Sequence, residues 1–531
     1  MNFFLKILVL FSIARSLIFA DITVDTNKHL SALTGTGNQI NSYIVNKVNE
    51  TNSGDTIRLN YFILDYRKST KYFYIALKNA LSRGVNIEII TEAKNTSKKH
   101  FCDKTIRKNR YKYSMSFLTG RTMPTFDSTC QQTLDKFEDI DGLENIDGNF
   151  TVIKVMEGAQ SLWNRAINHR KVALFDFKSK NKKSIIISSA NVAGSEEKQY
   201  EVAIDIDGIY LDKTWNWWNK VLDRDKCFKS YKNEDEDKLK SCNNILKNIN
   251  TTNGYFSHGE SGLWSYVVDT IDHNTRSNRN SLTNTDEKER YNSILWWLSK
   301  MQPSTDCELL MTTGSLSNLD ILKKMKNISN TCKVQLNYGK LFDNNSKIRD
   351  YLQDNRSPNF IVHHQPSIHA KMILWKGNWG NDGHFDSQDP ISTYYSWVGS
   401  LNLTTNALFD NDETMVRTNS KVLFDAYYSY FKKLDDKANI FWQEKSNGKN
   451  KIWNLNTYSK ISKKDTYSYP KSWNYQLAGV ADFDADGITD MLWRKTTDGK
   501  SYIWYMNDDG SRRTSRNISA LNLDYDIIGV K

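Results

Sequence analysis

A short polar pattern that occurs twice restricts the fold of this chain more than any other feature. His169 and Lys171 stand two residues apart before an apolar run, and His369 and Lys371 repeat this arrangement. At the start of a β-strand, this spacing directs both side chains to one face. The two histidines are 200 residues apart (369 minus 169), so one copy falls in each half of the chain. We therefore expect two related halves.

Each copy is followed by a second β-rich run that ends in Ser-x-Asn. The first run ends at Ser189 and Asn191, and the second ends at Ser400 and Asn402. A run that returns beside the first strand as a hairpin brings His, Lys, Ser and Asn to one end of the strands. A lone His-x-Lys is usually structural, but two copies with the same ending are far harder to obtain by chance.

The segments before each copy also share one order of predicted secondary structure. A β-rich run, a helical pattern and a second β-rich run occur in the same order in both halves. This alternation predicts a duplicated α/β fold with a mixed sheet covered by helices. The predicted strand, helix and strand are 56–64, 70–83 and 85–90 in the first half, and 307–313, 317–327 and 332–338 in the second.

The duplicated residues suit phosphodiester hydrolysis without a metal. That reaction needs a nucleophile, a proton donor for the leaving oxygen, and positive or hydrogen-bonding groups on the other phosphate oxygens. Two imidazoles supply the first two groups. Two lysines and two asparagines neutralise the developing charge, and no cofactor is expected for catalysis.

The two copies resemble the HKD motif, HxK(x)4D(x)nGSxN, of the phospholipase D superfamily, over about residues 35 to 435. The resemblance implies a pseudo-twofold duplicated α/β/α sandwich with one active site between its halves. It also implies that one histidine forms a phosphohistidine, while the other protonates the leaving group and then activates water. We favour His169 as nucleophile and His369 as acid, although a pseudosymmetric site leaves the reverse assignment open.

The resemblance also implies roles for the surrounding residues. It makes Lys171, Lys371, Asn191 and Asn402 the phosphate clamp. The implied supporting residues are the motif serines Ser189 and Ser400, the carboxylates Glu201 and Glu413 that orient the imidazoles, and Asp176.

The chain departs from the family pattern in three places. Ser188 replaces the motif glycine in the first copy, and Lys376 replaces the motif aspartate in the second. The second copy is also longer, with 28 residues between Lys371 and Ser400 (400 minus 371 minus 1). Its extra segment, 378–390, is expected to be a surface loop that either covers the site or is merely tolerated length.

The amino terminus predicts export. Residues 1–20 carry Lys6, a short apolar run and a small residue, Ala20, at a plausible cleavage site. We therefore expect a secreted protein or one in the lumen of the secretory or endolysosomal system. An even number of cysteines suits disulfides there, and neighbouring pairs are favoured. The expected pairs are Cys102–Cys130, Cys227–Cys242 and Cys307–Cys332.

The sequence does not decide between two kinds of anionic substrate. A net charge of +11 favours phospholipid headgroups, with peripheral membrane contact, or single-stranded nucleic acid. The resemblance points to an exported or lumenal branch that includes both lipid hydrolases and 5′ exonucleases. Our first hypothesis is phospholipid headgroup hydrolysis or phosphatidyl transfer, and the second is a single-strand exonuclease. A catalytically inactive binding or adhesion protein is the third.

The last ninety or so residues form a different kind of repeat. Trp442 aligns with Trp493 and Trp453 with Trp504, at a spacing of 51 (493 minus 442). The segment resembles FG-GAP/VCBS repeats and is expected to be a small all-β module that binds a protein or surface partner. Alternating carboxylates on one loop predict a structural calcium site. Its expected ligands are Asp482, Asp484, Asp486 and Asp490.

These features divide the chain into four parts. A length of 531 residues is too great for one hydrophobic core. We expect a signal peptide over 1–20, a first phospholipase D-like half over 21–250, a second half over 251–438, and the β-repeat module over 439–531.

Overall fold

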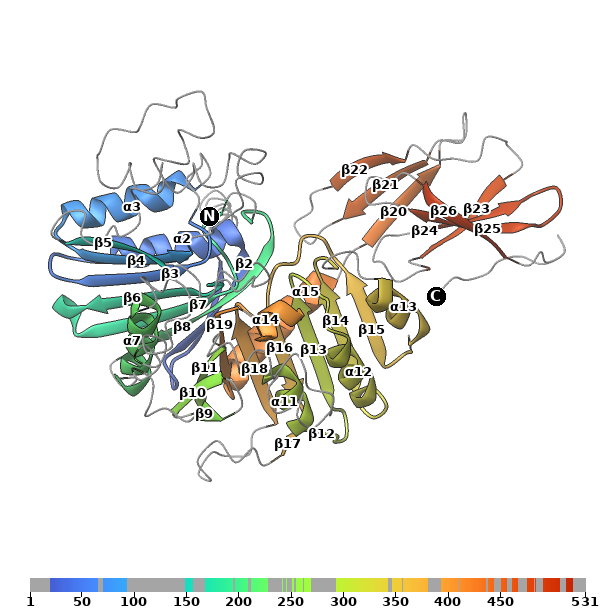
Figure 1. The fold of residues 1–531 in the computed structure, drawn as a ribbon. Coiled ribbons are helices and arrows are strands. Elements are labelled where there is room, and N and C mark those ends of the chain that lie inside the picture. The colour runs from blue at the N-terminus through green and yellow to red at the C-terminus, as the bar shows by residue number, and fades with distance from the viewer. Residues whose placement is uncertain are drawn as a thin grey trace, which may run out of the picture.

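The computed structural model contains two mixed α/β units and a separate group of C-terminal β-strands (Figure 1). The predicted signal segment lies outside the described residues. Those residues are 20–64, 70–92, 149–155, 168–193, 196–208, 212–227, 241, 245, 251–252, 255–260, 262–268, 293–341, 346–355, 357–380, 393–409, 411–435, 438–443, 450–455, 461–466, 475–481, 483, 490–506 and 512–518.

The first unit is built on an 8-stranded sheet of order β1-β2-β8-β7-β6-β3-β4-β5. Strands β3, β4 and β5 run parallel, and the remaining neighbours are antiparallel. The strands are β1 (Asp21–Asp25), β2 (Leu30–Thr36), β3 (Thr56–Tyr61), β4 (Asn86–Glu92), β5 (Phe150–Val155), β6 (Lys171–Phe177), β7 (Lys182–Ser188) and β8 (Tyr200–Asp207), and the helices are α2 (Gly37–Asn49), α3 (Lys71–Ser82) and α7 (Asp212–Cys227).

The second unit has a 9-stranded sheet of order β15-β14-β13-β16-β18-β19-β11-β10-β9. Its strands are β9 (Thr251–Thr252), β10 (Tyr255–Glu260), β11 (Leu263–Val268), β13 (Glu308–Thr313), β14 (Lys333–Tyr338), β15 (Phe360–His364), β16 (Met372–Lys376), β18 (Tyr394–Gly399) and β19 (Glu413–Thr418). Its helices are α11 (Ser293–Lys300), α12 (Leu319–Ile328), α13 (Ser346–Asp354), α14 (Thr405–Phe409) and α15 (Lys421–Asp435), and a small ribbon pairs β12 (Met301–Gln302) with β17 (Asn378–Trp379).

The two sheets share one strand order. The succession β8-β7-β6-β3-β4-β5 in the first sheet matches β19-β18-β16-β13-β14-β15 in the second. This confirms the duplicated α/β fold, including the strand–helix–strand order expected in each half. The elements predicted over 56–64, 70–83 and 85–90 are β3, α3 and β4, and those predicted over 307–313, 317–327 and 332–338 are β13, α12 and β14.

One hydrophobic core joins the halves. It combines Leu174 and Val202 of the first sheet with Met372 and Val416 of the second, all at most 1% exposed. Helices α7 and α15 contribute to the same cluster. The tryptophans of α7, including the fully buried Trp218, pack in this core rather than on a surface. Separate cores lie under α2 and α3 and under α11 to α13.

The C-terminal strands form two further sheets. Strands β20 (Ala438–Gln443), β21 (Asn450–Leu455) and β22 (Ile461–Thr466) form one. The other contains β23 (Tyr475–Ala481), β24 (Asp490–Lys495), β25 (Ser501–Met506) and β26 (Arg512–Ile518). The antiparallel pairs β20–β21 and β24–β25 hold the aligned segments of the sequence repeat. This all-β region is separate from the duplicated unit, as expected.

The cysteine pairing is confirmed where the structure describes it. Cys307 and Cys332 form a disulfide that ties the start of β13 to the start of β14. Cys227 is also disulfide-bonded, and its partner lies outside the described residues, as do Cys102, Cys130 and Cys242. Among the described helices, none has the length and apolar character needed to cross a bilayer.

Candidate active site

The hairpin expected from the motif spacing forms in both halves. Strand β6 pairs antiparallel with β7, and β16 pairs in the same way with β18. The pair Val172–Ile187 brings the start of the first His-x-Lys strand beside the end of its partner. The pair Met372–Val398 does the same in the second half. His, Lys, Ser and Asn of each motif therefore gather at one end of each sheet.

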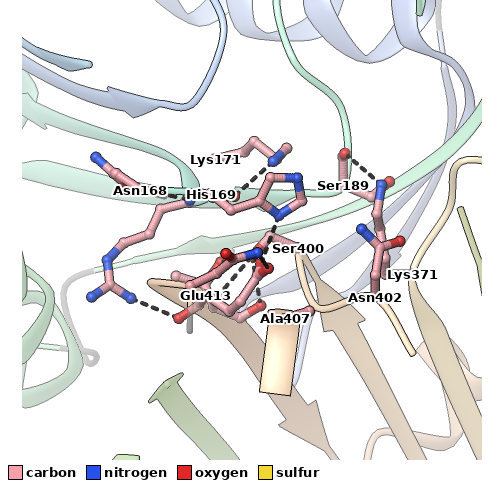
Figure 2. A network of polar contacts seen from close by, with 12 residues as sticks. Asn168, His169, Lys171, Ser189, Lys371, Ser400, Asn402, Ala407 and Glu413 are labelled. Atoms are coloured by element: carbon pink, nitrogen blue, oxygen red, sulfur yellow. Dashed lines mark hydrogen bonds and ion pairs between the residues drawn. The ribbon is translucent and has the colours of Figure 1, made fainter. Parts of the chain in front are cut away.

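The two halves hold each other's histidines. The backbone N–H of His169 donates to the carbonyl of Asp412 (2.9 Å), and its Nδ1 lies 2.8 Å from Oε2 of Glu413. Glu413 belongs to the second half. Figure 2 shows residues of both motifs gathered around His169.

His369 is anchored by the mirror-image arrangement. Its backbone N–H donates to the carbonyl of Tyr200 (3.0 Å), and its Nδ1 lies 2.6 Å from Oε1 of Glu201, a first-half residue. Each imidazole is thus fixed at its backbone and at Nδ1 by two consecutive residues of the opposite half. A carboxylate on Nδ1 sets the tautomer and leaves Nε2 for the substrate.

The motif serines hold these carboxylates. Ser189 Oγ donates to Oε2 of Glu201, and Ser400 Oγ donates to Oε2 of Glu413, each at 2.5 Å. The side chain of Asn411 donates to the other oxygen of Glu413 (3.1 Å). Both glutamates are fully buried. Four of the supporting residues expected from the family resemblance, Ser189, Ser400, Glu201 and Glu413, therefore lie around the histidines, with the carboxylates acting across the halves.

Both motif lysines are fully buried beside the histidines. Nζ of Lys171 donates to the carbonyl of His169 (2.6 Å), and Nζ of Lys371 lies 2.9 Å from Nδ1 of His369 and 3.5 Å from the carbonyl of Ser189. Burial, reinforced by the nearby Lys371 ammonium, lowers the pKa of Lys171 to about 7. Burial also lowers the pKa of Lys371. Two ammonium groups in so dry a site favour an anionic ligand.

The histidine and glutamate pKa values are shifted mainly by burial. Burial lowers the pKa of His169, against the opposing effect of Glu413, and it lowers the pKa of His369 well below its ordinary value, against the opposing effect of Glu196. Burial raises the pKa of Glu201 to about 7. Strongly shifted groups of this kind cluster at functional sites.

The two motif asparagines are engaged differently. The side-chain N–H of Asn191 donates to Glu196 (2.8 Å to Oε1), and its Oδ1 accepts from the backbone N–H of Ile63 (3.3 Å). Oδ1 of Asn402 instead accepts from the backbone N–H of Ser315 (3.1 Å). Within the described part of the chain, no residue accepts from the Asn402 side-chain N–H, which is therefore free for a phosphate oxygen.

Sequence reasoning missed three groups at this site. Glu196 lies in an acidic stretch that is typical of a solvated loop, and Phe62 follows β3 without a motif of its own. The Phe62 ring lies 5.1 Å from that of His169 and 5.5 Å from Nζ of Lys171. Arg170, the variable residue of the first His-x-Lys, is also part of the site.

Arg170 links the first motif to both halves. Its Nε donates to Asp225 of α7 (2.9 Å), and its Nη1 donates to the carbonyl of Glu413 (2.6 Å). Asn60 donates to the same Asp225 oxygen at 2.6 Å. Arg170 is fully buried, so this ion pair is part of the interior.

One further group resembles a metal site in composition. Oxygen or nitrogen atoms of Glu196, Glu201 and His369 all lie within 4.8 Å of one another. The Lys371 ammonium already lies 2.9 Å from Nδ1 of His369, so the positive charge that these carboxylates attract comes from the chain itself. We assign no metal to this group.

Two of the predicted site regions lie elsewhere. Asp176 lies near the far end of β6, where it pairs with Thr56 and Lys183, about 17 Å along the strand from Lys171. The oxygens of buried Asp490 accept hydrogen bonds from the backbone N–H groups of Met506 and Phe483, both at 2.9 Å. Of the other predicted calcium ligands, Asp482, Asp484 and Asp486 lie outside the described residues.

The comparisons with known proteins identify the family. A family model described as "Cardiolipin synthase, PLD-like domain" matches residues 44–214 and 306–435. The chain therefore belongs to this phospholipase D-like family, whose members act in general as phosphodiesterases or phosphotransferases. The match covers both motifs and stops before the C-terminal strands. No match was found among curated proteins.

Solved structures with a similar arrangement share little sequence with this chain. Phosphatidylserine synthase from Haemophilus influenzae is 11% identical over 80% of this chain and 89% of that chain, with a TM-score of 0.44. Polyphosphate kinase from Porphyromonas gingivalis is 11% identical over 81% of this chain, with a TM-score of 0.39, and only 49% of its own length is covered. Yeast tyrosyl-DNA phosphodiesterase is 12% identical over 69% of this chain and 83% of that chain, with a TM-score of 0.35.

Proposed function

We propose that this chain is an exported phosphodiesterase that cleaves phospholipid headgroups, or transfers the phosphatidyl group, through a phosphohistidine. The observation that carries the proposal is the crosswise anchoring of two histidines on opposite-half carboxylates, beside two buried lysines. Family membership supports the same chemistry.

In the proposed first step, the Nε2 lone pair of His169 attacks phosphorus. The bond from phosphorus to the leaving oxygen breaks, and that oxygen takes the proton from Nε2 of His369. In the second step, water attacks phosphorus, gives its proton to His369, and releases His169 with its original charge. An alcohol in place of water gives transfer.

The other side chains support these steps by charge and orientation. Lys171 and Lys371 place positive charge where the phosphate oxygens gain negative charge, and the Asn402 side-chain N–H adds a hydrogen-bond donor. Glu413 and Glu201 hold Nδ1 of the two rings and stabilise each imidazolium as it forms. No step in this scheme needs a metal ion.

A lipid substrate is favoured by the family description, which names cardiolipin synthase. The predicted export signal and positive charge suit a peripheral encounter with an anionic membrane surface. A secreted or lumenal location is part of the proposal.

The second candidate function is a single-strand nucleic-acid exonuclease. It is favoured by Phe62, a half-buried aromatic ring beside His169 and Lys171. An aromatic ring next to a phosphate site can stack on a terminal base, which contributes about 1–3 kcal/mol per base. An inactive binding protein is the third reading.

A side-by-side assay separates these readings. Purified mature protein is incubated with phosphatidylcholine vesicles and, separately, with 5′-hydroxyl single-stranded DNA, with His169→Ala and His369→Ala as controls. Headgroup release without DNA loss supports the lipid enzyme, and the converse supports the exonuclease. Absence of both activities in folded protein contradicts the enzyme proposal and favours a binding protein.

For the C-terminal strands we propose an FG-GAP/VCBS-like module that binds a protein or surface partner. The internal repeat and the alternating carboxylates from Asp482 to Asp490 support it. Calcium is proposed as a structural ion in that loop. Calorimetric titration of the full chain with Ca²⁺, compared with Asp484→Asn, tests the ion; no heat of binding would contradict it.

A further inference from the structure

The loop before β8 supplies a carboxylate that the two-histidine scheme leaves without a role. Glu196 is 7% exposed and accepts hydrogen bonds from both the backbone N–H (2.9 Å) and the side-chain N–H (2.8 Å) of Asn191. Its Oε2 also lies 3.6 Å from Nδ1 of His369. One buried carboxylate therefore contacts a clamp asparagine and lies beside a reacting imidazole.

Among the described residues of the second half, the position that corresponds to Glu196 in its distance from the motif asparagine holds no carboxylate. Glu196 lies five residues after Asn191, and the residue five after Asn402 is Ala407. Ala407, which Figure 2 labels, is buried. Glu413 receives the neutral side chain of Asn411 instead. Within the part of the chain that the structure describes, the carboxylate five residues after the motif asparagine is thus found on the His369 side alone.

Charged side chains from both halves of the site face His369. Glu201 on β8 and Glu196 on the preceding loop are negative. Lys371 beside β16 and Lys171 on β6 are positive, His169 lies within electrostatic reach, and Lys340 acts on Lys371 from the surface. His169 faces Glu413 and the same two motif lysines.

The buried groups around the two imidazoles are three acidic side chains (Glu196, Glu201 and Glu413) and two lysines (Lys171 and Lys371). Glu196 lies beside His369, so its negative charge favours a proton on that imidazole and opposes the effect of burial on the pKa of His369.

We propose that Glu196 is a positioning residue that keeps the transferable proton on His369 and so fixes His369 as the acid and His169 as the nucleophile. The inference rests on the proposed phosphodiesterase function. In the first step the proton passes from Nε2 of His369 to the leaving oxygen while the bond from His169 to phosphorus forms. Without the Glu196 charge, His369 loses that proton more easily.

The test compares two leaving groups in Glu196→Gln. The glutamine keeps an oxygen that accepts from Asn191 but removes the charge. On a diester with an alkyl leaving group, which needs the acid, we expect kcat/KM to fall by about 10- to 100-fold. On a p-nitrophenyl diester, whose leaving group departs as a stable anion, we expect a loss of less than about threefold. Both substrates report on the same folded population, so their ratio is insensitive to partial unfolding.

A purely structural role predicts a different result. If Glu196 only holds Asn191, the clamp is damaged for both substrates, and equal losses would overturn the proposal, as would no loss on either. Glu197→Gln, one residue along the same loop, is the matched control and should leave the ratio of the two rates unchanged. His369→Ala should reproduce the leaving-group pattern in a stronger form.

A second measurement does not depend on turnover. The His369 imidazole is titrated by NMR in the full chain, with His369→Ala identifying its signal. Removing the Glu196 charge should move this titration to lower pH by about one unit. An unchanged titration would overturn the proposal even if the enzyme is active. A shifted titration in a protein that cleaves no diester would instead locate the failure in the proposed function.

Discussion

The two ends of the active site use the same anchors but different charges. On both sides a histidine is held at its backbone and at Nδ1 by consecutive residues of the other half. Behind His169 lies the buried Arg170–Asp225 ion pair, where the second half has Ala370. Beside His369 lies Glu196, where the second half has Ala407. The two halves position their imidazoles in the same way, but each imidazole has its own electrostatic surroundings.

The histidines themselves give the largest test of this difference. Both His169→Ala and His369→Ala should lower kcat on an alkyl diester by about a thousandfold or more, because each removes a reacting group. Only His369→Ala should still accumulate a covalent phosphohistidine from the p-nitrophenyl diester. Mass spectrometry after an alkaline quench measures it. Accumulation in His169→Ala alone would reverse the assignment.

The buried ion pair should matter most for stability. Arg170→Met leaves Asp225 buried without its main partner, and breaking such a pair costs about 3–5 kcal/mol in the free energy of unfolding. Urea unfolding measures this. Lys421→Met, which breaks an exposed pair with Asp425, is the control and should leave the unfolding free energy nearly unchanged. Equal losses of unfolding free energy in the two variants would show that the buried pair contributes no more to stability than the exposed pair.

The crosswise carboxylates should have effects of intermediate size. Glu413→Gln removes the charge that stabilises the His169 imidazolium, and we expect a loss in kcat of about 10- to 100-fold. A double-mutant cycle with Ser400→Ala measures how much of this loss depends on the orientation of Glu413, because Ser400 donates to the same oxygen. Additive losses would show that the serine does not act through the carboxylate.

The pH dependence of anion binding should be smaller but directional. Because burial lowers the pKa of Lys171 to about 7, its ammonium charge is lost as the pH rises through that value. A non-hydrolysable phosphonate monoester with one fixed charge should therefore bind more weakly at about pH 8 than at about pH 6. Titration calorimetry measures this, and Lys171→Met should reduce the dependence to the part that comes from the ionisation of Glu201. Tighter binding at the higher pH would contradict the protonated lysine as a clamp.

The same lowered pKa predicts how stability changes with pH. The unfolded lysine keeps its ordinary pKa, so the unfolded state binds more protons than the folded state between about pH 7 and about pH 10.5. The Lys171 contribution therefore makes the protein more stable as the pH rises through this window.

The smallest effects are expected from the C-terminal strands. EDTA, or deletion of residues 440–531, should leave the cleavage of a small soluble diester unchanged, because both motifs lie before residue 436. Loss of cleavage by EDTA in folded protein would contradict metal-independent catalysis. If circular dichroism shows that the deleted protein no longer folds, the predicted boundary between the second half and the β-repeat module is wrong.

The sequence predicted the parts of the site that recur as patterns. The His-x-Lys pairs and the strand–helix–strand order have fixed spacings, and the structure has the corresponding hairpins and duplicated sheets. Glu201 and Glu413 were predicted to orient imidazoles, but their exchange between halves depends on how two units far apart in sequence pack together. Arg170 and Glu196 carry no local signal, because an ion pair with α7 and a contact with the other half are visible only in three dimensions.

Crosswise anchoring makes activity conditional on correct docking of the two halves. A half that folded alone would present its imidazole without the carboxylate that sets its tautomer, so a nascent or misassembled chain would have little power to attack phosphodiesters. If the protein is exported and acts on phospholipids, as proposed, this dependence would keep it from cleaving membrane lipids until both halves had folded and docked.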